Sequence, residues 1–360
     1  MKILIDARPL QTYSRYRGIG RYVNQIIESF KNDPDFYFLF FRGEDVDESP
    51  NNRILIKTPR RGVTFSDKIF LPRLLKKHRI DIYHSTAFAL PFKIPGIKYI
   101  ITMYDITPLL FPQFSSAKNI FIFKKILQSA KRADKIVTIS KSTMNDLVDL
   151  QIISGDKISV VYPPVNLESE DGNSIKERFP GIPSEYAFYA GGFDGNKNVK
   201  TLARALNIFQ KPLVLTGLIN GDQKKELNDL LTNKSRDLIV FTGYVSDKEL
   251  VLLYNKANLF VFPSLYEGFG YPPLEALKNG TPSVVSDSGS LKEVLKDAAV
   301  YLDDPLDEKE LAEKINLLWN DIPLRERIVN RGSEILKEYS IIKFKKKLEA
   351  IYSSVSSGSD

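Results

Sequence analysis

Two glutamates eight positions apart are the side chains of this sequence best placed to do chemistry. Glu267 and Glu275 bracket the turn Gly-Phe-Gly-Tyr-Pro-Pro, which follows an apolar run at residues 259–264. This run has the length and aromatic content of a strand buried on both faces. Pro272 and Pro273 suit the first turn of a helix, where a missing N–H does no harm. The free N–H groups and the positive dipole end of such a helix favour a phosphate.

The turn and its glutamates have distinct expected roles. Gly268 and Gly270 lie in the turn itself, and Asn279-Gly280 is the signal that ends the short helix. Glu275 can accept hydrogen bonds from a pair of ribose hydroxyls, while Glu267 points beyond the phosphates. A lone glutamate here would more often be a first-turn acid stabilised by the helix dipole. Two glutamates around this turn favour a bound sugar nucleotide instead.

A second glycine-containing loop follows the first predicted strand. In the stretch RYRGIGRY, Gly18 and Gly20 allow the backbone to approach a phosphate or a sugar closely. The alternative is a glycine turn that only starts a helix. The loop lacks the third glycine of a dinucleotide fingerprint, and no GxxxxGK[ST] segment is present, so NAD and P-loop functions are poorly supported.

Composition narrows the class of protein. The chain has 360 residues, 43% of them apolar and 26% charged, which favours a soluble protein of two domains. There is no cysteine, which excludes disulfides and thiolate metal sites. With only two histidines and no cysteine to join them, no metal site is expected. Met1 leads directly into a strand and no apolar run approaches about 18 residues, so the expected location is the cytoplasm.

Positive charge is concentrated in the first half of the sequence. Residues 1–165 contain 26 Lys and Arg against 15 Asp and Glu, and residues 166–360 contain 25 against 29. Much of the excess lies in two helical stretches, 65–80 and 117–135, which mix apolar and cationic residues. Such helices can lie on an anionic membrane surface or meet an acidic partner, and each can equally be a solvated face of a core helix. Nucleic acid is not expected, because no aromatic stacking platform accompanies the charge.

Strand-like runs alternate with helical periods along the whole chain, which predicts an α/β fold. Thirteen strands would make one sheet too wide, so two Rossmann-like, doubly wound domains that face a cleft are expected. The first domain spans residues 1–165 and the second 166–340, with a border in the polar stretch 167–174. A last helix at about 341–357 is expected to pack back on the first domain. The predicted strands are 2–6, 36–41, 53–57, 81–85, 99–105, 135–140, 159–163, 187–192, 212–217, 238–243, 259–264, 282–287 and 298–302.

The chain resembles the retaining glycosyltransferases of the GT-B fold, in family 4 (glycosyltransferase group 1). The resemblance covers nearly the whole sequence and is carried by DARPL, GIGRY, YHST, ITMYDITPLLFP, TISKST, YAGGFDGNKN, VFTGYVSDKEL and the E-x7-E element. The last of these is the specific part. By this resemblance, the first domain takes the acceptor and the second takes the nucleotide-sugar donor.

The resemblance assigns roles to individual residues. Glu275 matches the glutamate that holds the ribose, and Glu267 matches the one that approaches the donor sugar or its phosphate. Lys197 matches the lysine that neutralises the diphosphate, although in isolation it would be a solvent-exposed turn lysine. The remaining expected donor contacts are the backbone N–H groups near Phe269, Gly270 and Tyr271.

Two positions depart from the family pattern. Gly192 stands where the family usually has a phosphate-binding arginine, and Arg21 or another cation of the first domain is expected to compensate. Tyr104 stands where the family commonly has a histidine, and Asp105 follows it. A tyrosine can donate to a sugar hydroxyl but is a poor proton shuttle at neutral pH. His84, after a predicted strand, either lines the cleft or is a hydrogen-bonded structural histidine.

The activity that the resemblance implies is sugar transfer from GDP-mannose or a UDP-sugar to a glycan, polysaccharide or lipid-linked acceptor. The leaving diphosphate takes the proton of the acceptor, with Glu267, Asp105 and Tyr104 near the reacting carbon, and neither metal nor cofactor is required. A nucleotide-sugar epimerase, a phosphorylase and a non-catalytic donor-binding subunit remain alternatives. An acceptor on a lipid would place the protein at the inner face of the membrane.

Overall fold

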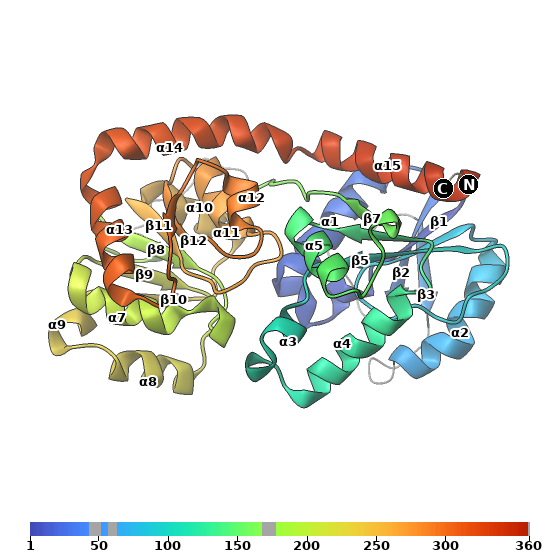
Figure 1. The fold of residues 1–360 in the computed structure, drawn as a ribbon, viewed down its shortest axis with the longest axis horizontal. Helices are drawn as coiled ribbons and strands as arrows, with labels where there is room; N and C mark the ends of the chain where they lie inside the picture. The colour runs from blue at the N-terminus through green and yellow to red at the C-terminus, as the bar shows by residue number, and fades with distance from the viewer. Residues whose placement is uncertain (43–51, 57–62, 168–177, 359–360) are drawn as a thin grey trace. The chain divides into compact units, whose positions relative to one another are not determined.

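The chain folds as two compact units, Met1–Pro164 with Ser340–Asp360 and Val165–Tyr339. The structure is a computed structural model and describes residues 1–42, 52–56, 63–167 and 178–358 (Figure 1). Most of the predicted border stretch 167–174 lies outside these residues. Both units are α/β domains built on a parallel sheet, as the sequence predicts.

The sheet of the first unit has seven strands within the described residues, in the order β3-β2-β1-β4-β5-β6-β7, and each pair is parallel. The order reverses between β1 and β4, which makes the carboxyl ends of these two strands the place where an open α/β sheet binds ligands. The strands are β1 Ile3–Asp6, β2 Phe36–Phe41, β3 Arg53–Ile56, β4 Ile82–Ser85, β5 Lys98–Met103, β6 Lys135–Thr138 and β7 Ile158–Val160.

Helices cover both faces of this sheet because successive strand side chains point to opposite sides. Leu4 and Tyr83 face a core that includes Leu71, Leu127 and Leu147 of α2, α4 and α5. The opposite face packs against α1 and α15. The helices of the unit are η1 Arg8–Gln11, η2 Tyr13–Tyr16, α1 Gly18–Phe30, α2 Val63–His78, α3 Thr107–Leu110, η3 Pro112–Phe114, α4 Ala117–Ala130, α5 Lys141–Asp149, η4 Gly155–Lys157 and α15 Ile341–Ser357.

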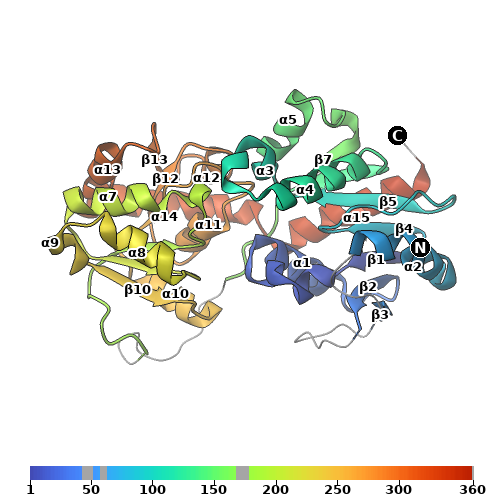
Figure 2. The same cartoon turned by 90° about the horizontal axis from the view of Figure 1, so that it is seen from below.

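The C-terminal helix belongs to the N-terminal unit, which confirms the prediction for residues 341–357. The ring of Phe344 packs edge-on against Tyr22 of α1, with 5.4 Å between ring centroids. The Tyr352 hydroxyl lies 2.9 Å from Nδ1 of His84 on β4. Figures 1 and 2 both show α15 beside the strands of the first unit. Apolar residues at helical spacing along α15 therefore pack into the core of the first unit, whose first strand lies more than 300 residues earlier in the sequence.

A buried ionic cluster joins β1 to α2. The Arg8 guanidinium donates to both carboxylate oxygens of Asp67, at 2.7 and 2.8 Å, and also to the carboxylate of Asp6. The Tyr83 hydroxyl donates to Asp6 at 2.7 Å. Arg8 and Asp6 are fully buried, and Asp67 is nearly so. Burial raises the pKa of the Asp67 carboxyl, although its hydrogen bond from Arg8 opposes this.

The sheet of the second unit has six parallel strands in the order β10-β9-β8-β11-β12-β13 within the described residues. The order reverses between β8 and β11, so the ligand-binding edge of this sheet lies after these two strands. Its strands are β8 Ala187–Ala190, β9 Leu213–Thr216, β10 Ile239–Gly243, β11 Leu259–Phe262, β12 Ser283–Ser286 and β13 Val300–Leu302.

The helices of the second unit pack against this sheet and against each other, α13 on α7 and α11 on α14 among them. They are η5 Gly195–Lys197, α7 Val199–Phe209, α8 Gly221–Asp229, α9 Asn233–Arg236, α10 Asp247–Lys256, α11 Tyr271–Lys278, α12 Leu291–Leu295, α13 Glu308–Asn320, α14 Ile322–Ile335 and η6 Leu336–Glu338. Among the described helices of both units, none combines the length and the apolar character needed to cross a bilayer.

Candidate functional site

The turn between β11 and α11 has the backbone that its glycines predict. Gly270 is the N-cap of α11 and has a φ of 94°, in the left-handed region that favours glycine. A Cβ built on Gly270 would lie 2.5 Å from Cδ2 of Leu291. Pro272 lies in the first turn of α11, and the helix ends at Lys278, just before Asn279-Gly280. The predicted strand, turn and helix are therefore all confirmed.

A second glycine turn, after β12, supports the backbone of Glu267. Gly289 has a φ of 59°, and a Cβ there would lie 2.4 Å from the carbonyl oxygen of Glu267. The N–H and the hydroxyl of Ser290 both donate to that oxygen, each at 3.1 Å. The backbone at Glu267 is thus fixed from one side before any ligand binds.

Lys197 is brought to Glu267 by the pairing of β8 with β11. The N–H of Leu265, after β11, donates to the carbonyl of Asn196, after β8, at 2.8 Å. The side chain of Asn198 donates to the carbonyl of Pro263 at 3.0 Å. These bonds join the two loops at the switch point of the sheet, where ligands of open α/β sheets bind.

Lys197 and Glu267 form an ion pair in this structure. The Lys197 Nζ atom donates to Oε1 of Glu267 at 2.5 Å, and their side chains are only 22% and 12% exposed. The Lys197 ammonium also lies 5.6 Å from the centre of the Phe262 ring. The lysine that the sequence assigns to a diphosphate is thus neutralised by the glutamate that the sequence assigns to the donor sugar. A diphosphate that bound Lys197 would have to compete with this carboxylate.

Glu275 lies in the second half of α11 and is 3% exposed. The hydroxyl of Tyr254 lies 3.4 Å from its Oε2 atom. The carboxylate is therefore held inside the unit, behind the turn. Its predicted contact with a ribose stays a prediction.

Replacing Glu275 with alanine is expected to weaken the binding of nucleoside diphosphate at least about tenfold, because two hydrogen bonds to a charged acceptor are lost. Isothermal titration with GDP and with its 2′,3′-dideoxy analogue measures this directly. The wild type should prefer GDP, whereas Glu275→Ala and the isosteric Glu275→Gln should discriminate less. Equal discrimination by all three proteins would remove Glu275 from the ribose site.

In the first unit the structure brings the loop at α1 and the end of β5 together. Gly18 is exposed at the start of α1, and Arg21 is half-buried one turn later. The next residue, Tyr22, packs its ring edge-on against Tyr104, with 5.3 Å between centroids. Oδ1 of Asp105 accepts the N–H of Thr107 at 2.9 Å, so this carboxylate makes a local turn just before α3.

The role predicted for Gly20 is wrong. A Cβ at this position would lie 2.5 Å from the carbonyl oxygen of Arg15 and 2.6 Å from its Cα atom. The glycine is required because α1 packs against the backbone of η2, and the space above it is already filled. A ligand cannot use Gly20 for a close approach.

The prediction that His84 lines a cleft is also wrong. His84 is fully buried, and its two ring nitrogens lie 2.9 Å from the Tyr352 hydroxyl and 2.8 Å from the Thr102 hydroxyl. Burial lowers its pKa to about 3. The histidine is a neutral, hydrogen-bonded core residue, which is the alternative that the sequence leaves open.

This histidine should make the stability of the protein depend on pH. Its pKa is lower in the folded than in the unfolded state, so its stabilisation is complete above about pH 6.5 and is lost as the pH falls toward 3. The slope should approach about 1.4 kcal/mol per pH unit. Urea unfolding of wild type and His84→Gln across this range measures it. The slope should be smaller in His84→Gln. It should persist in His78→Gln, because the histidine that this control removes is partly exposed. Equal slopes in all three proteins would contradict the assignment.

Gly192 has room for a larger side chain. It is half-buried, and a Cβ there would make only an ordinary contact of 3.5 Å with Oδ2 of Asp194. Its carbonyl accepts the hydroxyl of Tyr189. The absence of an arginine at this position is therefore not forced by packing.

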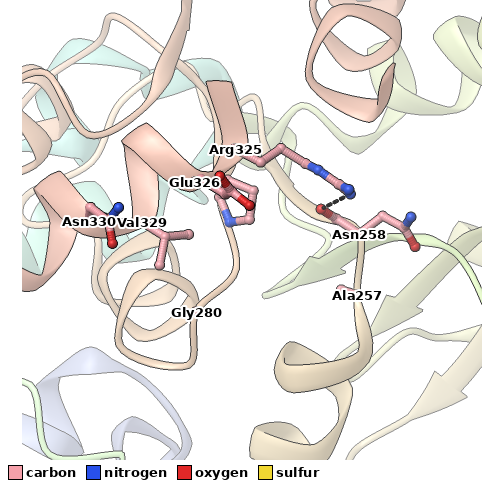
Figure 3. Close-up of a pocket in the computed structure, with 8 residues that line it drawn as sticks. Ala257, Asn258, Gly280, Arg325, Glu326, Val329 and Asn330 are labelled. Atoms are coloured by element: carbon pink, nitrogen blue, oxygen red, sulfur yellow. Dashed lines mark hydrogen bonds between the residues drawn. The ribbon is translucent and has the colours of Figure 1, made fainter. Parts of the chain in front are cut away.

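A pocket of about 440 Å³ elsewhere in the second unit is not part of this site. Figure 3 shows it between the chain before β11 and α14, where Arg325 donates to the carbonyl of Asn258. Asn258 and Pro282 precede β11 and β12, whereas Glu267 follows β11. Because ligands of such sheets bind beyond the carboxyl ends of the strands, this pocket lies at the wrong edge. Among the described residues, no cluster of three or more His, Cys, Asp or Glu side chains could hold a metal ion.

Several supporting residues could not be found from the sequence alone. Asn198 adopts a left-handed φ of 56° and reaches two distant carbonyls, those of Pro263 and Pro305. Gly289 and Ser290 hold Glu267, and the only signal for them was a Ser-Gly-Ser turn after a buried strand. These residues act through long-range backbone contacts, which no local pattern encodes.

Comparison with known proteins finds two matching glycosyltransferase families. The group 1 glycosyl transferases match residues 175–335, and glycosyltransferase family 4 matches residues 16–169. The O-antigen chain mannosyltransferase B of Escherichia coli is 27% identical, over 94% of this chain and 96% of its own. The O-antigen chain mannosyltransferase RfbU of Salmonella typhimurium is 32% identical, over 58% of this chain and 57% of its own.

Solved structures show the same fold. Sucrose-phosphate synthase from Thermosynechococcus elongatus matches with a TM-score of 0.79 and 17% identity, over 100% of both chains. The Anabaena protein HepE in complex with UDP and glucose matches with a TM-score of 0.76 and 17% identity, over 98% of this chain and 100% of its own. The two family matches, together with the two parallel-sheet units, place this chain among the family 4, group 1 glycosyltransferases of the GT-B fold.

Proposed function

We propose that this glycosyltransferase moves a mannosyl group from GDP-mannose to a growing polysaccharide or lipid-linked glycan, with retention of configuration. The observation that carries the donor site is the Lys197–Glu267 pair beside the N-terminus of α11. The names of the related O-antigen mannosyltransferases support mannose over other hexoses. A UDP-sugar is the alternative donor.

In this proposal the diphosphate replaces Glu267 as the partner of Lys197. The start of a helix attracts anions through its dipole and its backbone N–H groups, so we propose that the N–H groups near Phe269, Gly270 and Tyr271 donate to the phosphates. Glu275 orients the ribose. Lys197 and the helix dipole then stabilise the negative charge that grows on the leaving diphosphate.

The reacting carbon gains positive charge as the glycosidic bond to the diphosphate breaks. Once released from Lys197, the Glu267 carboxylate can stabilise this charge. The acceptor hydroxyl attacks from the face that the diphosphate leaves, and a diphosphate oxygen takes its proton. In the first unit, Asp105 and Tyr104 are proposed to bind the donor sugar, while Gly18 and Arg21 bind phosphate or acceptor. No metal ion or cofactor is needed for these steps.

Thermal shift and nucleotide release with a panel of GDP-, UDP-, ADP- and dTDP-sugars test the donor. GDP-mannose should stabilise the protein most and should be consumed when an acceptor extract is added. Release of a sugar phosphate that depends on inorganic phosphate would instead identify a phosphorylase. Interconversion of the sugar without release of nucleotide would identify an epimerase, and binding without turnover would identify a donor-binding subunit.

A peripheral position at an anionic membrane surface is part of the proposal. It is supported by the excess of Lys and Arg over Asp and Glu in residues 1–165, and it suits a lipid-linked acceptor. Acceptor extracts separated into lipid and aqueous fractions test it, because transfer to the lipid fraction is expected.

A further inference from the structure

One continuous segment of the first unit combines positive charge with exposed apolar side chains. Between Asp105 and Asp134 the sequence contains no aspartate or glutamate. Four large apolar side chains of this segment are exposed: Leu110 38%, Phe114 41%, Phe121 61% and Ile122 42%. Its cations are Lys118, Lys124, Lys125, Lys131 and Arg132.

Helix α4 sorts these residues onto two faces. Leu127 and Ala130 are buried against the core of the first unit. Lys118 lies three and four positions before Phe121 and Ile122, and Lys125 lies four and three positions after them, which places all four on one side of the helix. All four are exposed, and the Lys125 ammonium lies 5.2 Å from the centre of the Phe121 ring. The helix therefore turns a mixed apolar and cationic face to solvent.

Two more exposed apolar side chains lie on the elements that precede α4. α3 contacts α4 and is followed directly by η3, and these two elements carry Leu110 and Phe114 (Figure 1). The rings of Phe111 and Phe114 stack with 6.1 Å between centroids. We call the exposed face formed by Leu110, Phe114, Lys118, Phe121, Ile122 and Lys125 the α3–α4 surface.

We propose that the α3–α4 surface docks on an anionic lipid bilayer, with Phe121 and Ile122 in the acyl boundary and the lysines at the headgroups. An anionic bilayer interface offers an apolar layer together with negative charge, which complement the apolar and cationic side chains of this face. The lysine stems can lie along the apolar layer while their ammonium groups reach the phosphates. A second copy of the chain would oppose cations to cations. The biological role of this docking rests on the proposed transfer to a lipid-linked acceptor. The docking itself requires no donor.

Sedimentation with vesicles measures the docking. The full chain should bind vesicles of equal parts phosphatidylcholine and phosphatidylglycerol, and should not bind phosphatidylcholine alone. Binding should fall strongly at about 0.5 M salt, where charges are screened beyond about 3–5 Å. Lys118→Ser with Lys125→Ser should lower the partition coefficient about 25-fold, at about fivefold for each lysine. Phe121→Ser with Ile122→Ser should lower it at least about tenfold.

Matched control variants test whether the loss of binding is specific to the α3–α4 surface. Lys76→Ser with Lys77→Ser removes the same charge from α2 of the same unit, and Ile208→Ser with Leu317→Ser removes exposed apolar side chains from the second unit. Both should bind nearly as the wild type does. Loss of binding in these variants as large as in the α3–α4 variants would overturn the proposal, as would absence of binding at low salt.

A fluorescent reporter distinguishes insertion from adhesion by charge alone. Trp319 is the single tryptophan, so Trp319→Phe with Phe121→Trp places the only indole on the α3–α4 surface. Its emission should shift to the blue when anionic vesicles are added, and an unchanged spectrum with bound vesicles would contradict docking by this face. Self-association of the wild type that the α3–α4 variants abolish would assign the face to a protein partner instead. GDP binding should be unchanged in all these variants, which separates failure here from failure of the donor assignment.

Discussion

Replacing Glu267 with glutamine is expected to lower the rate of sugar transfer by about 10²–10³-fold and yet to tighten the binding of nucleoside diphosphate. The rate falls because a neutral amide no longer stabilises positive charge at the reacting carbon. Affinity rises because Lys197 loses the carboxylate that now lies 2.5 Å from it, so the diphosphate no longer competes for the cation. For a partly buried ion pair this gain should be about fivefold. Steady-state kinetics and titration with GDP measure the two effects separately.

An exposed ion pair of the same unit provides the control. Lys200 and Glu226 also form a lysine–glutamate pair, but their side chains are 51% and 53% exposed. Glu226→Gln should change neither rate nor affinity measurably. If Glu267→Gln weakens both rate and GDP binding, the carboxylate holds the donor in its ground state, and the competition for Lys197 does not occur.

The ion pair between Lys197 and Glu267 could not be predicted from the sequence, although the importance of each residue could. Glu267 was found from the turn that follows it, and Lys197 from the motif around it. That the two side chains meet depends on the pairing of β8 with β11, strands that begin 72 residues apart. Local patterns predict strands, turns and helix ends well because propensity, proline and glycine act within a few residues. They say little about which loop ends face each other across a sheet.

The two incorrect assignments have the same physical origin. Glycine and histidine are both residue types that often contact ligands. Gly20 follows one predicted strand, and His84 lies near the end of another. In the structure the backbone of Arg15 fills the space over Gly20, and Tyr352, from a helix 268 residues away, bonds His84. Glycine and histidine serve internal packing as readily as binding, and only the neighbours in space decide between the two.

The largest effect on stability is expected from Arg8→Met. Arg8 is fully buried and is the cation between the carboxylates of Asp6 and Asp67, which are themselves buried. Methionine would leave both carboxylates without a cation inside the first unit. The free energy of unfolding should fall by about 3–5 kcal/mol, as for other broken buried ion pairs. Urea unfolding followed by circular dichroism measures this loss.

The pH dependence of that loss tests its cause. Burial raises the pKa of the Asp67 carboxyl and Arg8 opposes this, so without Arg8 that pKa should rise further in the folded state. The variant should then regain stability relative to wild type as the pH falls and this carboxyl becomes neutral. Arg331→Met is the matched control, because Arg331 also pairs with two carboxylates, those of Asp297 and Glu334, but on the surface. Its cost should stay below about 1 kcal/mol. A loss in Arg8→Met that is equally small, or that does not diminish in acid, would show that the packing of Arg8 between the rings of Phe41 and Phe88, rather than its charge, holds β1 to α2.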